Sequence, residues 1–412
     1  MEISVIIIII AVIAGLYSAI NIGANDVANA MATSVASGAL TIKRAVMVAA
    51  ICDILGATLV GVHVTNTIRQ GIVNPMSFSD TPQLFVYGML ASVLGSSLWV
   101  NIATYLKLPV STTHSIIGGV LGFGLVSVGI AGIKWTVVLY VVLTWVVSPF
   151  FGGIIAYFIF TIIKKFILSH PDPIAQVKKI GPFFVGAVAF ILSLATIFKG
   201  LKNLHLDMPF GKATAVSFLI GVIAFLVGAM FLRKYKKRDL DPYYQVELLA
   251  NPLQVLSASF QAFSHGANDV ANAVGPVAAI VTVIHTGAVS MEVSVPFWLL
   301  LAGGCGIAFG IFMWGHRVME TVGKKITKIT PTRGFSAEFG TATTVLICSR
   351  LGMPVSTTHV AIGNIIGVGF ARGISAINLG VIKKIFSAWV ISLPAAGLFS
   401  IAFYKLIVLF FG

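Results

Sequence analysis

The amino-acid sequence predicts an all-α polytopic membrane protein with about twelve transmembrane segments, arranged as two inverted repeats with broken helices. The first observation behind this fold class is the composition. Of 412 residues, 58% are hydrophobic and 10% are charged, and the mean hydropathy is +1.00. The second observation is that two polar strings each occur twice between apolar runs. An ordinary soluble domain carries a larger charged fraction, so that class is excluded.

The first repeat is expected to cover residues 1–163. An apolar span at its start leads directly into the string GANDVANA at residues 23–30, and a second string, PVSTTH, follows at residues 109–114. Between and after the strings, the apolar runs have the length that crosses a bilayer as helix. Spans are expected at residues 3–20, 45–62, 83–105, 115–130 and 135–163.

A connecting insert at residues 164–250 matches neither repeat and is expected to add two transmembrane helices, at 182–198 and 213–232. The second repeat, residues 251–412, then follows the order of the first, with GANDVANA at 266–273 and PVSTTH at 354–359. Its spans are expected at residues 252–284, 296–315, 335–349, 360–371 and 377–410. An odd number of segments separates the starts of the two repeats, so the halves should be inverted.

The net charge of +14 indicates membrane orientation and not a nucleic-acid partner, because the basic residues lie mostly in short loops between spans. Placing the N-terminus outside assigns most Lys and Arg residues to cytoplasmic loops. We therefore expect a multi-pass protein of the cell (inner) membrane with both termini outside.

GANDVANA is typical of a cation site. A carboxylate inside a span costs about 2.5 to 3.5 kcal/mol on the insertion scale, so Asp26 and Asp269 indicate function. The glycine should free the backbone, and the resulting carbonyl, amide and carboxylate oxygens suit a hard cation such as sodium. The alternative is that the aspartate is protonated or caps a broken helix. The expected sodium ligands are Asn25, Asp26, Asn29, Asn268, Asp269 and Asn272.

PVSTTH is typical of an oxyanion site. A proline at a helix start, followed by Ser-Thr-Thr, combines hydroxyl groups with the free N–H groups and the positive dipole end of a first turn. Two inverted copies would surround one tetrahedral anion from both sides. The alternative is that the hydroxyls only cap kinked helices. The expected anion-binding residues are Ser111, Thr112, Thr113, Ser356, Thr357 and Thr358.

Four further titratable residues lie in apolar segments. His114 and His359 close the two PVSTTH strings and could relay protons, although a hydrogen-bonded packing role is favoured. Asp53 and Glu338 have no matching partner in the other half and are weaker candidates for an ion pathway.

The four strings, and the two halves joined by an insert, closely resemble the inorganic phosphate transporter (PiT) family of cation-coupled symporters. The resemblance implies an inverted-repeat membrane fold, transport of inorganic phosphate, and coupling to sodium or protons. By motif position it places Asn25, Asp26, Asn268 and Asp269 at the cation and substrate centre, with both asparagines on the phosphate, and the six hydroxyl residues around it. The insert is short and lacks the long cytoplasmic domain of some animal members.

We therefore expect a secondary active symporter that imports inorganic phosphate with sodium by alternating access, and not an enzyme. No cofactor is expected beyond sodium as coupling ion. The expected partners are phosphate, sodium and the lipid bilayer, without nucleic acid and with a homodimer left open. The alternatives are a proton-coupled phosphate or sulfate permease and, in a different class, an anion channel, which would show rings of Lys or Arg in its pore.

Overall fold

The computed structural model describes the chain except for residues 1–2, 62–71, 201–207, 290–292, 294 and 351–354, so Pro354 of the second PVSTTH string lies outside the described residues. The described part consists of helices joined by turns and loops, and its one isolated β-bridge lies between Val73 and Ile133. The first half contains α1 (Ile3–Ala36), α2 (Ile42–Val60), α4 (Pro82–Tyr105), α5 (Thr112–Ser127) and α6 (Trp135–Ile163). The short turns η2 (Pro75–Phe78) and η3 (Ile130–Gly132) lie between them.

The remaining helices follow the expected order. The insert consists of α7 (Pro173–Gly200) and α8 (Phe210–Lys234), preceded by the π-helical turn η4 (Lys164–Leu168). The second half contains α9 (Pro242–Thr286), α10 (Phe297–Glu320), α11 (Pro331–Arg350), α12 (Thr357–Arg372) and α13 (Leu379–Phe411), with η6 (Thr321–Lys325) and η7 (Ile374–Ala376) between them.

Several of these helices can span a membrane. Within the described residues, eight are long and apolar enough to cross a bilayer, whereas α5 and α12 have 16 residues each and are shorter than the roughly 20 that a full crossing needs. The chain is therefore a multi-pass membrane protein. The expected total of about twelve segments stays a prediction.

The prediction that GANDVANA breaks its helix is wrong. Both α1 and α9 continue through the string, so the helical backbone keeps its carbonyl groups in internal hydrogen bonds. The glycines serve close packing instead. A Cβ atom at Gly23 would collide with the carbonyl of Ile307 on α10, and one at Gly266 would collide with the carbonyl of Asp53 on α2. Helical structure is instead interrupted near the PVSTTH strings, where α4 ends before α5 begins and α11 ends before α12 begins.

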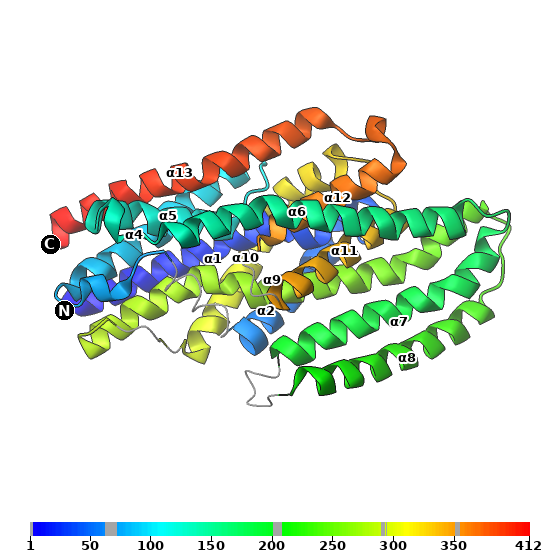
Figure 1. Cartoon of the computed structure of the whole chain (residues 1–412), viewed down its shortest axis with the longest axis horizontal. Coiled ribbons are helices and arrows are strands. Elements are labelled where there is room, and N and C mark those ends of the chain that lie inside the picture. The colour runs from blue at the N-terminus through cyan, green and yellow to red at the C-terminus, as the bar shows by residue number, and fades with distance from the viewer. Residues whose placement is uncertain (1–2, 62–71, 201–207, 290–292, 294, 351–354) are drawn as a thin grey trace.

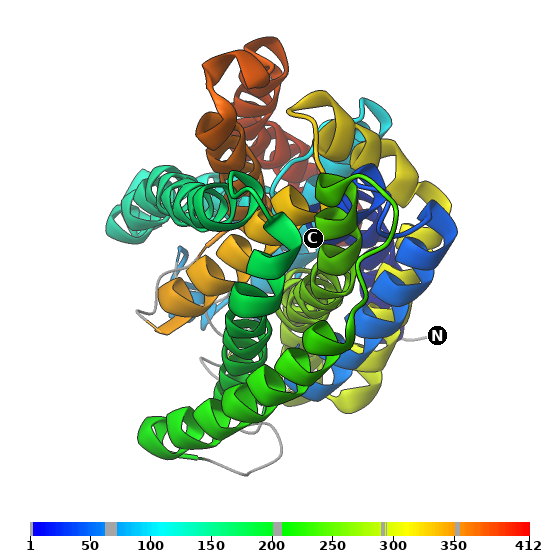
Figure 2. The ribbon, with the colours of Figure 1, turned by 90° about the vertical axis from the view of Figure 1, so that its right-hand side faces the viewer.

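Helices of one half pack on helices of the other half, and the contacts come in equivalent pairs. Helix α1 packs on α10 as α9 packs on α2, and α6 packs on α12 as α13 packs on α5. Helices α1 and α9 run antiparallel, because Gly15 lies against Val277 while Ser37, near the other end of α1, bonds to Gln254 (Figure 1). Helices α7 and α8 pack mainly on each other and extend from one side of the bundle (Figure 2).

Candidate functional site

The two aspartates of the GANDVANA strings are held by hydroxyl groups from both PVSTTH strings. The Thr112 hydroxyl donates to Oδ2 of Asp26 at 2.8 Å, and the Thr358 hydroxyl donates to Oδ1 of the same carboxylate at 3.4 Å. In the matching arrangement, Thr357 donates to Asp269 at 3.3 Å and Thr113 does so at 3.5 Å. Each carboxylate therefore receives one hydroxyl from its own half and one from the other.

The second asparagine of each string supports this network. The Asn29 amide donates to the Thr358 hydroxyl at 2.9 Å, and the Asn272 amide donates to Thr113 at 3.2 Å. The Asn272 amide also donates to Asp269 at 3.0 Å. Both asparagines are buried, so these amides orient the threonines beside the aspartates without exposure to solvent.

The N-termini of α5 and α12 meet at this network. Ser111 and Ser356 are the N-cap residues, and each hydroxyl oxygen accepts from the backbone N–H of the histidine three residues later, at 3.2 Å. Both serines therefore cap their helices, and each keeps a hydroxyl proton to donate. The first turns of both helices thus lie beside the aspartates, and the free N–H groups and positive dipole end of a first turn favour an anion nearby.

The first asparagines of the two strings differ. The Asn25 amide donates to the Thr104 hydroxyl at 2.9 Å and to the Leu108 carbonyl at 3.0 Å, and its oxygen accepts from the Val110 N–H at 3.0 Å. Asn25 thus holds the segment that leads into α5. Asn268 is half-buried, and its amide lies 3.5 Å from Asp269.

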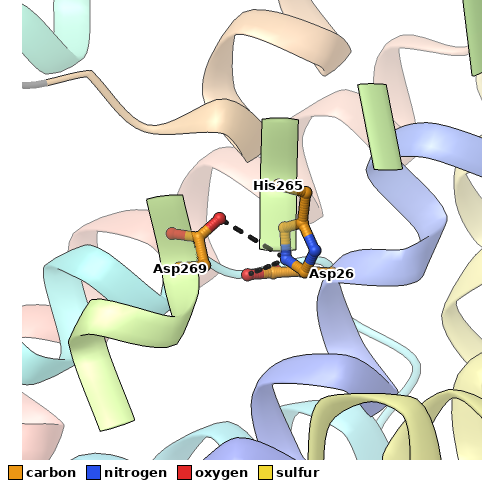
Figure 3. A group of neighbouring side chains, drawn as sticks. All are labelled: Asp26, His265 and Asp269. Carbon is orange, nitrogen blue, oxygen red and sulfur yellow. Dashed lines mark ion pairs between the residues drawn. The ribbon is translucent and has the colours of Figure 1, made fainter. Parts of the chain in front are cut away.

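His265 is a functional candidate that the sequence reasoning missed. It extends from α9 toward both aspartates, with Nε2 at 3.4 Å from Asp269 and 3.6 Å from Asp26 (Figure 3). Its Nδ1 lies 2.5 Å from Oδ1 of Asp53. From the sequence alone, Asp53 is only a weaker candidate for an ion pathway. The four residues are at most 2% exposed, so three carboxylates and one imidazole share one buried site.

The two positions that match Asp53 and His265 in the duplicated frame carry apolar residues. His265 directly precedes Gly266, whereas Ile22 directly precedes Gly23. Gly266 packs on Asp53 as Gly23 packs on Ile307. The symmetry is therefore broken at one pair of positions: Asp53 and His265 are polar, whereas the equivalent residues Ile307 and Ile22 are apolar. A histidine directly beside one copy of a repeated string was the available signal.

Glu338 on α11 forms a second buried cluster. Its carboxylate accepts from the hydroxyls of Thr33, of Ser34 at 3.0 Å and of Ser257 at 2.5 Å, and from the Gln254 amide at 3.5 Å. Thr33 and Ser34 lie about two turns beyond Asp26 on α1, so this cluster is separate from the aspartates. Its donors satisfy the carboxylate, which agrees with a structural role.

His114 and His359 lie in an aromatic stack between the halves. His114 stacks on Trp145 at 3.5 Å between ring centroids, His359 stacks on Trp389 at 3.6 Å, and the two imidazoles meet edge to face at 4.4 Å. Within the described residues, neither imidazole hydrogen-bonds to Asp26 or Asp269. The contacts agree with packing, but the expected hydrogen bond is present only at His359, whose Nδ1 lies 3.4 Å from the Trp145 carbonyl, and both ring nitrogens of His114 lack a partner within the described residues.

Comparisons with known proteins agree with the family resemblance of the GANDVANA and PVSTTH strings. The model of the phosphate transporter family matches residues 22–400. The chain is 46% identical to a phosphate permease of Pyrococcus abyssi, with 97% of each chain covered, and 38% identical to inorganic phosphate transporter 2-1 of Arabidopsis thaliana chloroplasts, with 94% of this chain and 70% of that protein covered. A solved structure titled as the sodium-dependent phosphate transporter has 43% sequence identity and a TM-score of 0.90, covering 98% of this chain and 99% of that one. The chain belongs to the phosphate transporter family.

Proposed function

We propose that this protein is a symporter that imports inorganic phosphate together with sodium by alternating access. The observation that carries the proposal is that threonines of the two short helices α5 and α12, called the half-helices below, donate to Asp26 and Asp269. These threonines lie at the N-termini of both half-helices. The threonine hydroxyls that would donate to a bound phosphate thus donate to the two aspartates in this structure.

Phosphate would lie between the N-termini of α5 and α12. Hydroxyl groups from both PVSTTH strings, the remaining protons of Ser111 and Ser356, and the first-turn N–H groups together supply donors on two sides of a tetrahedral anion. A phosphate that keeps one proton can also donate to a carboxylate. Sulfate has no proton at neutral pH, so we expect it to bind poorly.

Sodium would neutralise the aspartates. Two like charges about 6 Å apart repel by about 2.8 kcal/mol at an effective dielectric of about 20, and phosphate would face several carboxylates. We propose Asp26 and Asn29 as ligands of one ion, and Asp269 and Asn272 as ligands of the other, with Asn268 and Asn25 beside them. One ion per aspartate gives at least two sodium ions per phosphate.

The hydroxyl groups provide a physical link between the two ligands. When sodium binds an aspartate, the carboxylate no longer needs the threonine proton, and Thr112 or Thr357 becomes free to donate to phosphate. In this structure the cavity beside Thr112 and Asn272 has a volume of only about 10 Å³, about the space of one water. Under alternating access, α5 and α12 would move to open the site between the aspartates to its ligands.

Proton coupling is the alternative that a specific observation favours. His265 lies between Asp26, Asp53 and Asp269, and a proton on this imidazole would neutralise part of the same charge. Such a transporter would move phosphate with protons through the same anion site. The two functions differ in which gradient drives uptake.

The test is uptake of labelled phosphate into proteoliposomes. We expect an inward sodium gradient to drive accumulation, and we expect arsenate, but not sulfate, to compete. Unchanged uptake when choline replaces sodium, together with a response to a proton gradient, would contradict sodium coupling and support proton coupling. Equal inhibition by sulfate and arsenate would contradict the proposed phosphate selectivity.

A further inference from the structure

We propose that the protein carries a binding site for an anionic phospholipid, in a crevice between the α7–α8 pair and the main bundle. The crevice has a volume of about 520 Å³, within the usual range of about 300 to 1,000 Å³ for ligand pockets. It is lined by apolar side chains of α6, α7, α8, α9 and α11. Among them are Ile163, Val177, Phe184, Leu232, Leu253 and Phe335.

The crevice reaches the outer surface of the bundle. Two of its lining residues, Phe231 and Leu256, are 74% and 44% exposed. Helix α8 packs mainly on α7, and the pair extends from one side of the bundle (Figure 2). On the face of a membrane helix bundle, a crevice with exposed apolar walls lies against lipid tails.

Lipid tails fit this crevice better than water does. Thr332 is the one lining residue with a polar side chain, and its hydroxyl already donates to Glu247 at 2.9 Å. A buried water needs two to four polar partners, whereas an acyl chain gains dispersion contacts with every wall. The apolar walls therefore select hydrocarbon.

Charge selects the headgroup. Basic residues follow directly on the lining residues of three elements, and we call them the basic rim. They are Lys164, Lys165, Lys178, Lys179, Arg233 and Lys234. All are exposed except the half-buried Lys178, and within the described residues none of the six forms an ion pair. Basic clusters between transmembrane helices at the end of a bundle bind anionic headgroups.

Nearby acidic groups offset only part of this charge, because Asp172, Asp239, Asp241 and Glu247 are four residues, whereas the six rim residues are followed by Lys236, Lys237 and Arg238. The carboxylates of Asp172 and Asp241 each cap a helix, accepting from Ala175 N–H and Tyr244 N–H. Glu247 accepts both bonds from Thr332. A second copy of this chain is a poorer occupant, because a symmetric contact would bring two basic rims together.

The experiment compares lipid retention by the purified full-length protein in native mass spectrometry, with phosphatidylglycerol and phosphatidylcholine of equal chain length added in turn. We expect the wild type to retain phosphatidylglycerol and to lose phosphatidylcholine. A rim variant, Lys178→Gln/Lys179→Gln/Arg233→Gln/Lys234→Gln, should lower the apparent affinity for phosphatidylglycerol by at least about tenfold.

Two further variants make the result specific. The control Lys324→Gln/Lys325→Gln/Lys383→Gln/Lys384→Gln removes the same charge from exposed residues at the same end of the bundle and should bind as the wild type does. Gly181→Leu places a side chain in the crevice, next to the flexible tip of Leu232, and should weaken retention with all charges kept. Equal retention of both lipids, an equal loss in the control, or full binding by Gly181→Leu would each overturn the proposal.

Discussion

Thr112 and Thr357 each hold a buried aspartate of their own half through one hydroxyl group. Thr358 and Thr113 hold the same carboxylates from the opposite half. In the proposed mechanism, these hydroxyls donate to the carboxylate when phosphate is absent and to phosphate when it binds. Removing one hydroxyl should therefore weaken the binding of phosphate even though the aspartate stays in place.

We expect Thr112→Val and Thr357→Val each to raise the phosphate concentration that gives half-maximal uptake. A buried polar group left without its partner costs about 1 to 3 kcal/mol, which corresponds to an increase of about 5- to 150-fold. The control is Thr282→Val on α9, which removes a hydroxyl that bonds only to the Ala278 carbonyl. A silent substitution at either Thr112 or Thr357 would mean that one half alone forms the site.

The Asp53–His265 pair allows a test of stability at the place where the symmetry is broken. His265→Ile leaves Asp53 buried without its partner and should cost about 3 to 5 kcal/mol of unfolding free energy. The double variant Asp53→Ile/His265→Ile recreates the apolar pair Ile22 and Ile307, and should recover more than half of that loss. Chemical unfolding of the purified proteins measures both changes. A double variant as unstable as the sum of its single variants would refute the equivalence of the two positions.

The sequence identifies the residues that occur in pairs and misses those that do not. Asp26, Asp269 and the threonines stand in strings that repeat letter for letter, so duplication alone draws attention to them. His265 has an isoleucine as its counterpart, and its role depends on α2 bringing Asp53 beside α9. That contact joins residues more than 200 positions apart, and no local pattern encodes it.

At the scale of elements, the polar strings lie on continuous helices. Three polar residues in an apolar run favour a break when the helix is considered alone, because they need partners. In the folded chain the partners come from other helices, as with Thr358 on α12 donating to Asp26 on α1, so the helix has no reason to unwind. The repeated glycines, expected to loosen the backbone, let helices cross closely instead.

We expect Gly23→Ala and Gly266→Ala to destabilise the protein by about 1 to 3 kcal/mol, because a Cβ atom at either position meets the backbone of the crossing helix. The matched control is Gly211→Ala in the exposed start of α8, where a Cβ atom meets no neighbour. It should leave stability unchanged or raise it by up to about 1 kcal/mol. Thermal unfolding separates the cases, and a neutral Gly23→Ala would show that the crossing is looser than described.

At the scale of the whole molecule, the halves are intertwined. Equivalent helices make equivalent contacts, and α1 and α9, which carry the two GANDVANA strings, run antiparallel. This arrangement supports an inverted duplication with the site between its halves and residues 164–250 outside both. The repeat boundaries, the homodimer and the placement of both termini outside stay predictions.

The orientation can be tested by labelling single cysteines in intact cells. Ser79 lies in the exposed segment before α4, at the end of the bundle where the C-terminus of α13 contacts Tyr87. Lys237 lies at the opposite end, after α8. A membrane-impermeant thiol reagent should label Ser79→Cys from outside and label Lys237→Cys only after permeabilisation. The reverse pattern would place both termini in the cytoplasm.

The central claim is that sodium on Asp26 and Asp269 releases threonine donors to phosphate, so the two ligands must strengthen each other's binding by the same factor. The direct measurement is the affinity of the purified protein for labelled phosphate at a series of sodium concentrations. We predict that the logarithm of the affinity rises with that of sodium with a slope approaching about two, and that Asp26→Asn or Asp269→Asn lowers the slope while the protein still folds and inserts. A phosphate affinity that is independent of sodium in the wild type would contradict the account.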